Sequence, residues 1–194
     1  MAGIFIHLAT SKRYIEKHSD TIADPVAFMD GAVLPDLTDN KEHTHYGSRK
    51  EVGDMATRMR EKIDLRKFLQ MNPDDTDLNR GKFLHLYIDQ EYYNSFLTKE
   101  YLDRVDMLNF IKDNVYSNAR FDKYVEEHYN VTFASTSIKD RLDSWYAGLQ
   151  KLDTSRWGTN WSGEILFSKE EMNAFIERIS DVDLVKLRTE IMEG

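Results

Sequence analysis

The segment DLNRGKFLHLYIDQEYYNSFL (Asp77–Leu97) decides the fold, because its pattern differs from that of every other helical stretch in the chain. Apolar and aromatic side chains cover most of the circumference of the helix that it predicts, whereas a surface helix has only one apolar stripe. The segment therefore predicts a central helix that other helices surround. The side chains concerned are Phe83, Leu84, Leu86, Tyr87, Ile88, Tyr92, Tyr93, Phe96 and Leu97.

Most of the remaining sequence also predicts helix. Periodic apolar positions indicate helices over residues 6–17, 26–34, 55–70, 99–113, 118–129 and 137–152, with polar loops over 36–53 and 154–167. Asp24 is the expected N-cap of the second helix, with Pro25 in its first turn, and Ser168 opens the last helix with a capping box to Glu171. No strand pair or internal repeat is evident. The sequence predicts a single all-α domain over residues 1–194 built as a multi-helix bundle.

The composition restricts the chemistry. The 194 residues carry a formal charge of −8 and include six histidines and no cysteine. A disulfide scaffold, a zinc ribbon and an iron–sulfur cluster are thereby excluded, and any transition-metal site must use histidines and carboxylates. No apolar run approaches the ~18 residues of a membrane helix, so we expect no integral membrane contact. The first six residues lack the features of a signal peptide, and the acidic balance disfavours stable nucleic-acid binding; we expect a soluble, cytoplasmic protein.

The strongest chemical signal lies in the central segment itself. His85 and Asp89 are four residues apart, so they lie on one face of the predicted helix, among apolar neighbours. A buried ionised carboxylate needs compensation, which a metal ion held by both side chains would supply. The alternative is a plain hydrogen bond between His85 and Asp89 that joins two core helices.

Three other residues are candidates of the same kind. Asp36 follows Pro35 at the end of a short apolar helix, where a carboxylate is misplaced without a cation, although Pro-Asp is also a common turn pair. His45 lies in the polar loop close to Asp36, although loop histidines are often solvated. His7 interrupts the apolar start of the chain, although a lone histidine in such a stretch is often an ordinary core residue.

The order of these motifs resembles the zinc-dependent phospholipase C family, which is related to the S1/P1 nucleases. The order is an early histidine, then Gly31-x-x-x-Pro-Asp36, then Thr44-His45, then Gly81-x-x-x-His85-x-x-x-Asp89. The resemblance covers roughly residues 4–93, so it divides the chain into a metal-site half of about 1–97 and C-terminal helices of about 98–194. It implies a bundle of the zinc-dependent phospholipase C type.

The resemblance also implies a ligand set. By motif position, Asp36, His45, His85 and Asp89 would hold one zinc ion, and Asp89 would bridge to a second ion that His7 helps to bind. His45 is preferred to His43 because the family pattern has a histidine directly after threonine.

The chain departs from the family in two places. The secreted phospholipases of the family have an N-terminal tryptophan that ligates zinc, whereas the first tryptophan here is Trp145. They also have a later His-x-x-x-Glu helix, whereas His128 is followed by Thr132. The resemblance therefore supports one zinc site, with a second ion near His7 and Asp89 that Asp122 or Glu127 would complete.

Taken together, these residues predict a metal-dependent hydrolase that acts on a small phosphoester with one or two zinc ions or other divalent transition metals. A metal held by two histidines and two carboxylates activates water and stabilises developing charge on phosphate, and Asp36 is the candidate to orient or deprotonate that water. The rival interpretation is a non-catalytic helical protein whose metal site is structural or vestigial and which acts as an interaction module.

Overall fold

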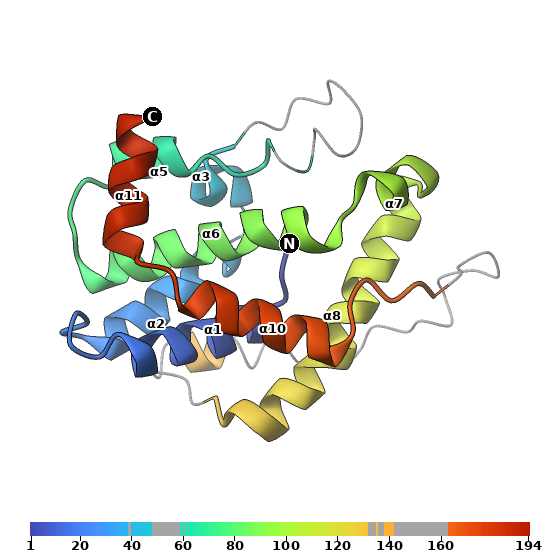
Figure 1. The fold of residues 1–194 in the computed structure, drawn as a ribbon, viewed down its shortest axis with the longest axis horizontal. Coiled ribbons are helices and arrows are strands. Elements are labelled where there is room, and N and C mark those ends of the chain that lie inside the picture. The colour runs from blue at the N-terminus through green and yellow to red at the C-terminus, as the bar shows by residue number, and fades with distance from the viewer. Residues whose placement is uncertain (39, 48–58, 60, 132–134, 136–137, 142–162) are drawn as a thin grey trace.

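Helix α6 (Asp77–Phe96) runs through the middle of the structure, as the central segment of the sequence predicts (Figure 1). The computed structural model describes all residues except 39, 48–58, 60, 132–134, 136–137 and 142–162. No strand occurs among the described residues, so this part of the chain is all-α as predicted. The other helices whose bounds are described are α1 (Ile4–Lys17), α2 (Pro25–Val33), the 3₁₀ helix η1 (Leu34–Asp36), α3 (Lys41–His45), α5 (Leu65–Met71), α7 (Lys99–Arg104), α8 (Met107–Tyr129), α10 (Lys169–Ser180) and α11 (Leu184–Glu193).

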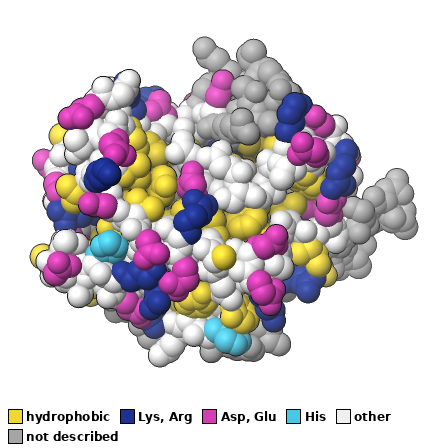
Figure 2. All heavy atoms as spheres, in the orientation of Figure 1, with side chains coloured by type: hydrophobic (Ala, Val, Ile, Leu, Met, Phe, Trp, Pro, Cys, Tyr) yellow, Lys and Arg dark blue, Asp and Glu magenta, His cyan; other side chains and the backbone are white. Residues whose placement is uncertain are grey.

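Helix α1 begins inside the protein. Its first two turns, from Ile4 to Ser11, are buried throughout, because α2, α6, α8 and α10 all contact this helix. Ion pairs join the outer side of α1 to Glu177 of α10, from Arg13 (2.8 Å) and Lys17 (2.9 Å). On the face that Figure 2 shows, acidic and basic side chains are interspersed. Exposed pairs of this kind each contribute only about 0–1 kcal/mol, so burial of the first turns holds α1 in place.

The backbones of α2 and α6 touch at two glycines. A Cβ atom added at Gly31 would lie 2.1 Å from the carbonyl oxygen of Leu78, and one added at Gly81 would lie 2.1 Å from that of Phe28. No side chain fits at either position, so glycine allows a closer approach than ordinary helix packing. One turn beyond this contact, His85 on α6 reaches Ala32 on α2. The glycine contact therefore determines where the His85 ring lies.

Side-chain caps explain most helix starts, including the two that the sequence predicts. Asp24 accepts a hydrogen bond from the Ala27 amide at the start of α2, and Ser168 and Glu171 form the capping box of α10. Each such cap satisfies backbone donors that the first turn leaves unpaired. Five further caps have the same form, from Asp64, Thr76, Thr98, Asp106 and Asp183.

Several predicted boundaries are wrong. The expected helix over 99–113 is divided into α7 and α8, because Asp106 caps a new helix, and α8 then continues through 114–117 to Tyr129. The polar loop over 36–53 contains the short helix α3. Of the helix expected over 55–70, residues 55–58 and 60 lie outside the described residues, and 61–64 interrupt it before α5 begins at Leu65 after its cap Asp64. Residues 142–152 of the helix expected over 137–152, and most of the loop expected over 154–167, lie outside the described residues. None of the described helices has both the length and the apolar composition that a bilayer-spanning segment requires.

The glycine contact gives a stability prediction. Replacing Gly31 by alanine should lower the free energy of unfolding by about 1–3 kcal/mol, because the added methyl group overlaps the α6 backbone. The control position is Ala174, which is exposed on α10. There alanine should be more stable than glycine, so Ala174→Gly should lower the free energy of unfolding by about 1 kcal/mol through its lower helix propensity. Chemical denaturation of the Gly31→Ala and Ala174→Gly variants measures both. A Gly31→Ala protein as stable as the parent would contradict the contact.

Candidate metal centre

The structure brings together the five residues that the sequence singled out as metal ligands. They come from four elements: α1, the end of η1, the end of α3, and the middle of α6. All five are buried, and Asp36, at 8% exposed, is the least so. The five are His7, Asp36, His45, His85 and Asp89.

Short local contacts place Asp36 opposite His45. The Thr44 hydroxyl donates a hydrogen bond to the Pro35 carbonyl oxygen (2.9 Å), so the residues before Asp36 and before His45 are joined directly. The chain turns away immediately after His45, where Tyr46 takes a left-handed conformation (φ 64°) and pairs with Ile63. The sequence pattern Thr44-His45 thus has a structural reason: the threonine fixes the helix end that carries the histidine.

Four donor atoms gather around His45 and His85. The Nε2 atoms of the two rings are 3.4 Å apart. Oδ1 of Asp36 lies 3.7 Å from the first and 3.9 Å from the second, and Oδ2 of Asp89 lies 3.3 Å and 3.8 Å from them. The ligand atoms of Asp36, His45 and His85 lie within 4.8 Å of one another and could hold one ion, and Oδ2 of Asp89 lies beside the two histidines.

The hydrogen bonds of the Nδ1 atoms of His45 and His85 indicate which nitrogen of each ring has a lone pair that faces the cluster. Nδ1–H of His85 donates to the Ala32 carbonyl oxygen (2.8 Å), and Nδ1–H of His45 donates to that of Lys41 (3.1 Å). A carbonyl oxygen only accepts, so in each neutral ring the proton is on Nδ1 and Nε2 has a lone pair. Burial lowers the pKa of His85 to about 3, so this ring is neutral at physiological pH. Two inward lone pairs supported by backbone carbonyls are the usual arrangement of metal-binding histidines.

The two carboxylates are charged despite their burial. Burial alone would raise the pKa of Asp36 and of Asp89, but neighbouring imidazoles lower both, and Lys41 also lowers that of Asp36. The Lys41 ammonium group lies 2.6 Å from Oδ1 of Asp36. Within the described part of the chain, Oδ2 of Asp89 has no hydrogen-bond partner, whereas its Oδ1 accepts one from the Ala2 amide (2.7 Å). An unpartnered charged oxygen at a buried position is costly without a cation.

His7 forms a second group with His85 and Asp89. Its ring stacks on the ring of His85, with centroids 3.8 Å apart, and its Nε2 lies 3.4 Å from Oδ1 of Asp89. Neither ring nitrogen of His7 has a hydrogen bond to another described residue. His7, His85 and Asp89 therefore could hold a metal ion of their own, next to the group of Asp36, His45 and His85.

The other histidines lie elsewhere. His18 contacts the Ser180 carbonyl oxygen, His128 contacts that of Tyr124 in its own helix, and His43 is exposed. Asp122 is buried on α8, where burial raises its pKa to about 7, and it belongs to neither metal-binding group. The side chain of Glu127 lies outside the described residues. The sequence did not predict the contact of Lys41 with Asp36, because nothing in the residues around Lys41 distinguishes it from a solvated loop lysine.

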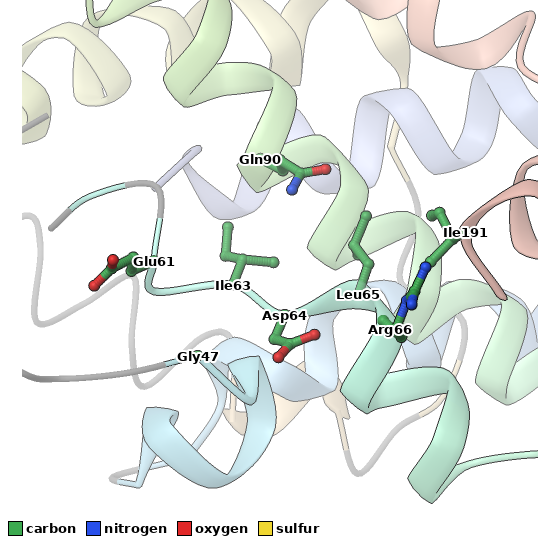
Figure 3. Close-up of a pocket in the computed structure, with 8 residues that line it drawn as sticks. All are labelled: Gly47, Glu61, Ile63, Asp64, Leu65, Arg66, Gln90 and Ile191. Atoms are coloured by element: carbon green, nitrogen blue, oxygen red, sulfur yellow. The ribbon is translucent and has the colours of Figure 1, made fainter. Parts of the chain in front are cut away.

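A cavity of about 550 Å³ is lined by residues that are close in sequence to the predicted ligands, but the five predicted ligands do not line it. Gly47 and Gln90 line it, two residues after His45 and one after Asp89, and in Figure 3 the Gln90 side chain faces Ile63 and Leu65. Neighbouring residues on a helix point about 100° apart, so Gln90 and Asp89 face different sides of α6. The cavity is therefore beside the histidine–aspartate cluster, not its opening.

The fold and the site together define an all-α protein with a buried histidine–aspartate cluster that could hold a metal ion. Comparisons of this chain with protein-family models, with curated proteins and with solved structures give no match. The donor set of imidazole nitrogens and carboxylate oxygens fits Zn²⁺, and the inward lone pairs of His45 and His85 and the unpartnered Oδ2 of Asp89 are the observations that such an ion would explain.

Metal binding can be tested with two histidines of one helix. Zn²⁺ added to chelator-treated protein should raise the unfolding temperature, because a ligand that binds the folded state stabilises it. His45→Ala should weaken Zn²⁺ binding by at least about tenfold, since it removes a ligand, whereas His43→Ala should leave it unchanged. Calorimetric titration of both variants measures the difference. Equal Zn²⁺ affinity of the two variants, or no binding by the parent, would contradict the assignment.

Proposed function

We propose that this protein is a metal-dependent hydrolase of phosphoesters that uses zinc or a similar divalent ion. One observation carries the proposal. Nε2 of His45 and Nε2 of His85 lie 3.4 Å apart, with an ionised carboxylate oxygen of Asp36 and one of Asp89 within 4 Å of both. A bound divalent cation would supply a Lewis acid for a phosphoryl oxygen and lower the pKa of a bound water toward ~7.

In this proposal, Asp36, His45, His85 and Asp89 hold the first ion. His7 and Asp89 belong to the second, with His85 packed between the two groups. The Ala32 and Lys41 carbonyl oxygens keep the two imidazole rings oriented, so both Nε2 atoms stay available to the ion at neutral pH.

Asp36 is the proposed catalytic residue. It is the last residue of η1 and lies at the edge of the cluster, since the other four predicted ligands are less exposed than Asp36. Because its neighbours lower the pKa of Asp36, it is a weak base but a permanent hydrogen-bond acceptor. Its role in this proposal is therefore to orient the attacking water rather than to take the proton alone.

The resemblance to the zinc-dependent phospholipase C family supports phosphoester hydrolysis over other metal-dependent reactions. The departures from that family limit the proposal to one or two ions. The sequence of α8 contains no His-x-x-x-Glu pair. A small phosphoester is the proposed substrate, with no stable nucleic-acid binding, since no basic surface is expected at a formal charge of −8.

A second candidate function is a structural metal site in a non-catalytic interaction module. The observation that favours it is burial: His7, His85 and Asp89 are 0% exposed, and structural sites are closed whereas catalytic sites keep an open position. Metal binding without hydrolysis would select this alternative.

The catalytic role is tested by hydrolysis of p-nitrophenyl phosphate and bis(p-nitrophenyl) phosphate with Zn²⁺. Asp36→Asn and His85→Ala should each lower the rate by at least about 100-fold, because each removes part of the site that activates water. Asp103→Asn, at an exposed position paired with Lys99, is the matched control and should retain the parent rate. Circular dichroism verifies that each variant is folded. Folded Asp36→Asn and His85→Ala proteins that hydrolyse as fast as the parent would refute the enzyme proposal.

The number of ions is tested separately at His7. His7→Gln should reduce the stoichiometry from two ions to one while the affinity of the remaining ion changes by less than about threefold, since His7 belongs only to the second group. Metal analysis of the dialysed protein, followed by titration, measures both quantities. A single ion in the parent that His7→Gln does not affect would place His7 among ordinary core residues.

A further inference from the structure

Lys41 stands at the solvent edge of the histidine–aspartate cluster. Its side chain is 37% exposed, whereas that of its partner Asp36 is 7% exposed. Its ammonium nitrogen lies 2.6 Å from Oδ1 of Asp36, which makes it a cation in direct contact with the site. It opens helix α3, four residues before His45. An anion that reaches Asp36 on the side of Lys41 would meet this ammonium group.

The oxygen that Lys41 contacts is also the one that faces the two histidines. Oδ1 of Asp36 lies 3.7 Å from Nε2 of His45 and 3.9 Å from Nε2 of His85. A divalent ion at the usual ~2 Å from this oxygen would lie within about 5 Å of the Lys41 nitrogen. Two cations so close repel each other strongly unless an anion lies between them or the lysine side chain moves.

An anionic phosphoryl group fits this space chemically. Its oxygens share one phosphorus atom, so one oxygen can face the ion while another accepts a hydrogen bond from the ammonium group. With one divalent ion, the charges of the ion, Asp36, Asp89 and Lys41 leave the site positive, and a second ion increases this. A phosphomonoester carries two negative charges on its terminal oxygens, whereas a phosphodiester carries one. The excess positive charge therefore favours the monoester.

We propose that Lys41 is an anion-binding residue that leaves Asp36 for the terminal phosphate of the substrate, and that the protein prefers phosphomonoesters to phosphodiesters. This inference rests on the proposed function, and it adds the substrate class and the residue that selects it. The same contact should bind inorganic phosphate, the product of monoester hydrolysis.

The chain allows a clean test, because Lys41 has two separate roles. Its carbonyl oxygen supports the His45 ring, and its side chain contacts Asp36. Lys41→Gln removes the charge but keeps the carbonyl, so metal binding should persist. Lys41→Arg keeps the charge and should restore anion binding. Lys186→Gln, at an exposed lysine on α11, is the matched control.

The first measurement is binding of inorganic phosphate to the Zn²⁺-loaded protein by calorimetry. Lys41→Gln should weaken phosphate binding by at least about tenfold, which is the loss of one charge-assisted hydrogen bond, and Lys41→Arg by less than about threefold. Without phosphate, Lys41→Gln should bind Zn²⁺ as tightly as the parent or more tightly. By linkage, phosphate should increase Zn²⁺ affinity more in the parent than in Lys41→Gln. Equal phosphate affinity of the parent and Lys41→Gln would overturn the inference.

The second measurement is hydrolysis of the two p-nitrophenyl esters. The parent should have the higher kcat/KM on the monoester, and Lys41→Gln should lose at least about tenfold on the monoester and less on the diester. A parent that hydrolyses both esters but prefers the diester would overturn the inference and leave the proposed function intact. A parent that binds Zn²⁺ but hydrolyses neither would refute the proposed function, and the phosphate titration would still decide the role of Lys41.

Discussion

The rest of the structure depends on one constraint: buried imidazole lone pairs and carboxylate charges converge where there is little water to solvate them. Nε2 of His45 and Nε2 of His85 are 3.4 Å apart, and the carboxylate oxygens of Asp36 and Asp89 lie within 4 Å of one or both. A hydrogen bond between two rings whose protons are both on Nδ1 cannot satisfy these atoms. A shared cation can satisfy these atoms. Buried polar groups that would otherwise destabilise the folded state would then form a binding site.

The helices around this cluster hold it with backbone contacts rather than with loops. Gly31 and Gly81 let α2 and α6 approach until their backbones touch, and one turn further the Ala32 carbonyl oxygen orients His85. Because these two helices fix the His85 ring, its position in the cluster does not depend on a bound ligand. The same contact explains why the motif has glycine four residues before His85: any side chain there would separate the two helices and move the ring.

The sequence predicted the helical class, the central helix and the caps at Asp24 and Ser168, because these depend on local patterns that a single chain displays. The gathering of His7, Asp36, His45, His85 and Asp89 was an expectation from motif order, and their role as ligands stays a prediction. Sequence reasoning missed two features. The division of α7 from α8 depends on a local cap, Asp106, which competes with the apolar periodicity that continues across 99–113. The contact of Lys41 with Asp36 depends on how η1 and α3 meet, and such tertiary packing is not encoded in a local pattern.

Exposure to solvent increases across the cluster from His7 to Lys41. This gradient bears on the choice between the two candidate functions. His7, His85 and Asp89 are 0% exposed, His45 is 3%, Asp36 is 8%, and the Lys41 side chain beyond them is 37%. A purely structural site has no need of a charged residue at one edge, since a neutral cover would avoid repulsion with the ion. A catalytic site needs an approach from one side, with a group there that attracts the substrate. The position of the partly exposed Lys41 beside the buried Asp36 therefore supports the proposed hydrolase over a purely structural site, with His7, His85 and Asp89 on α1 and α6 as the most deeply buried part of the cluster.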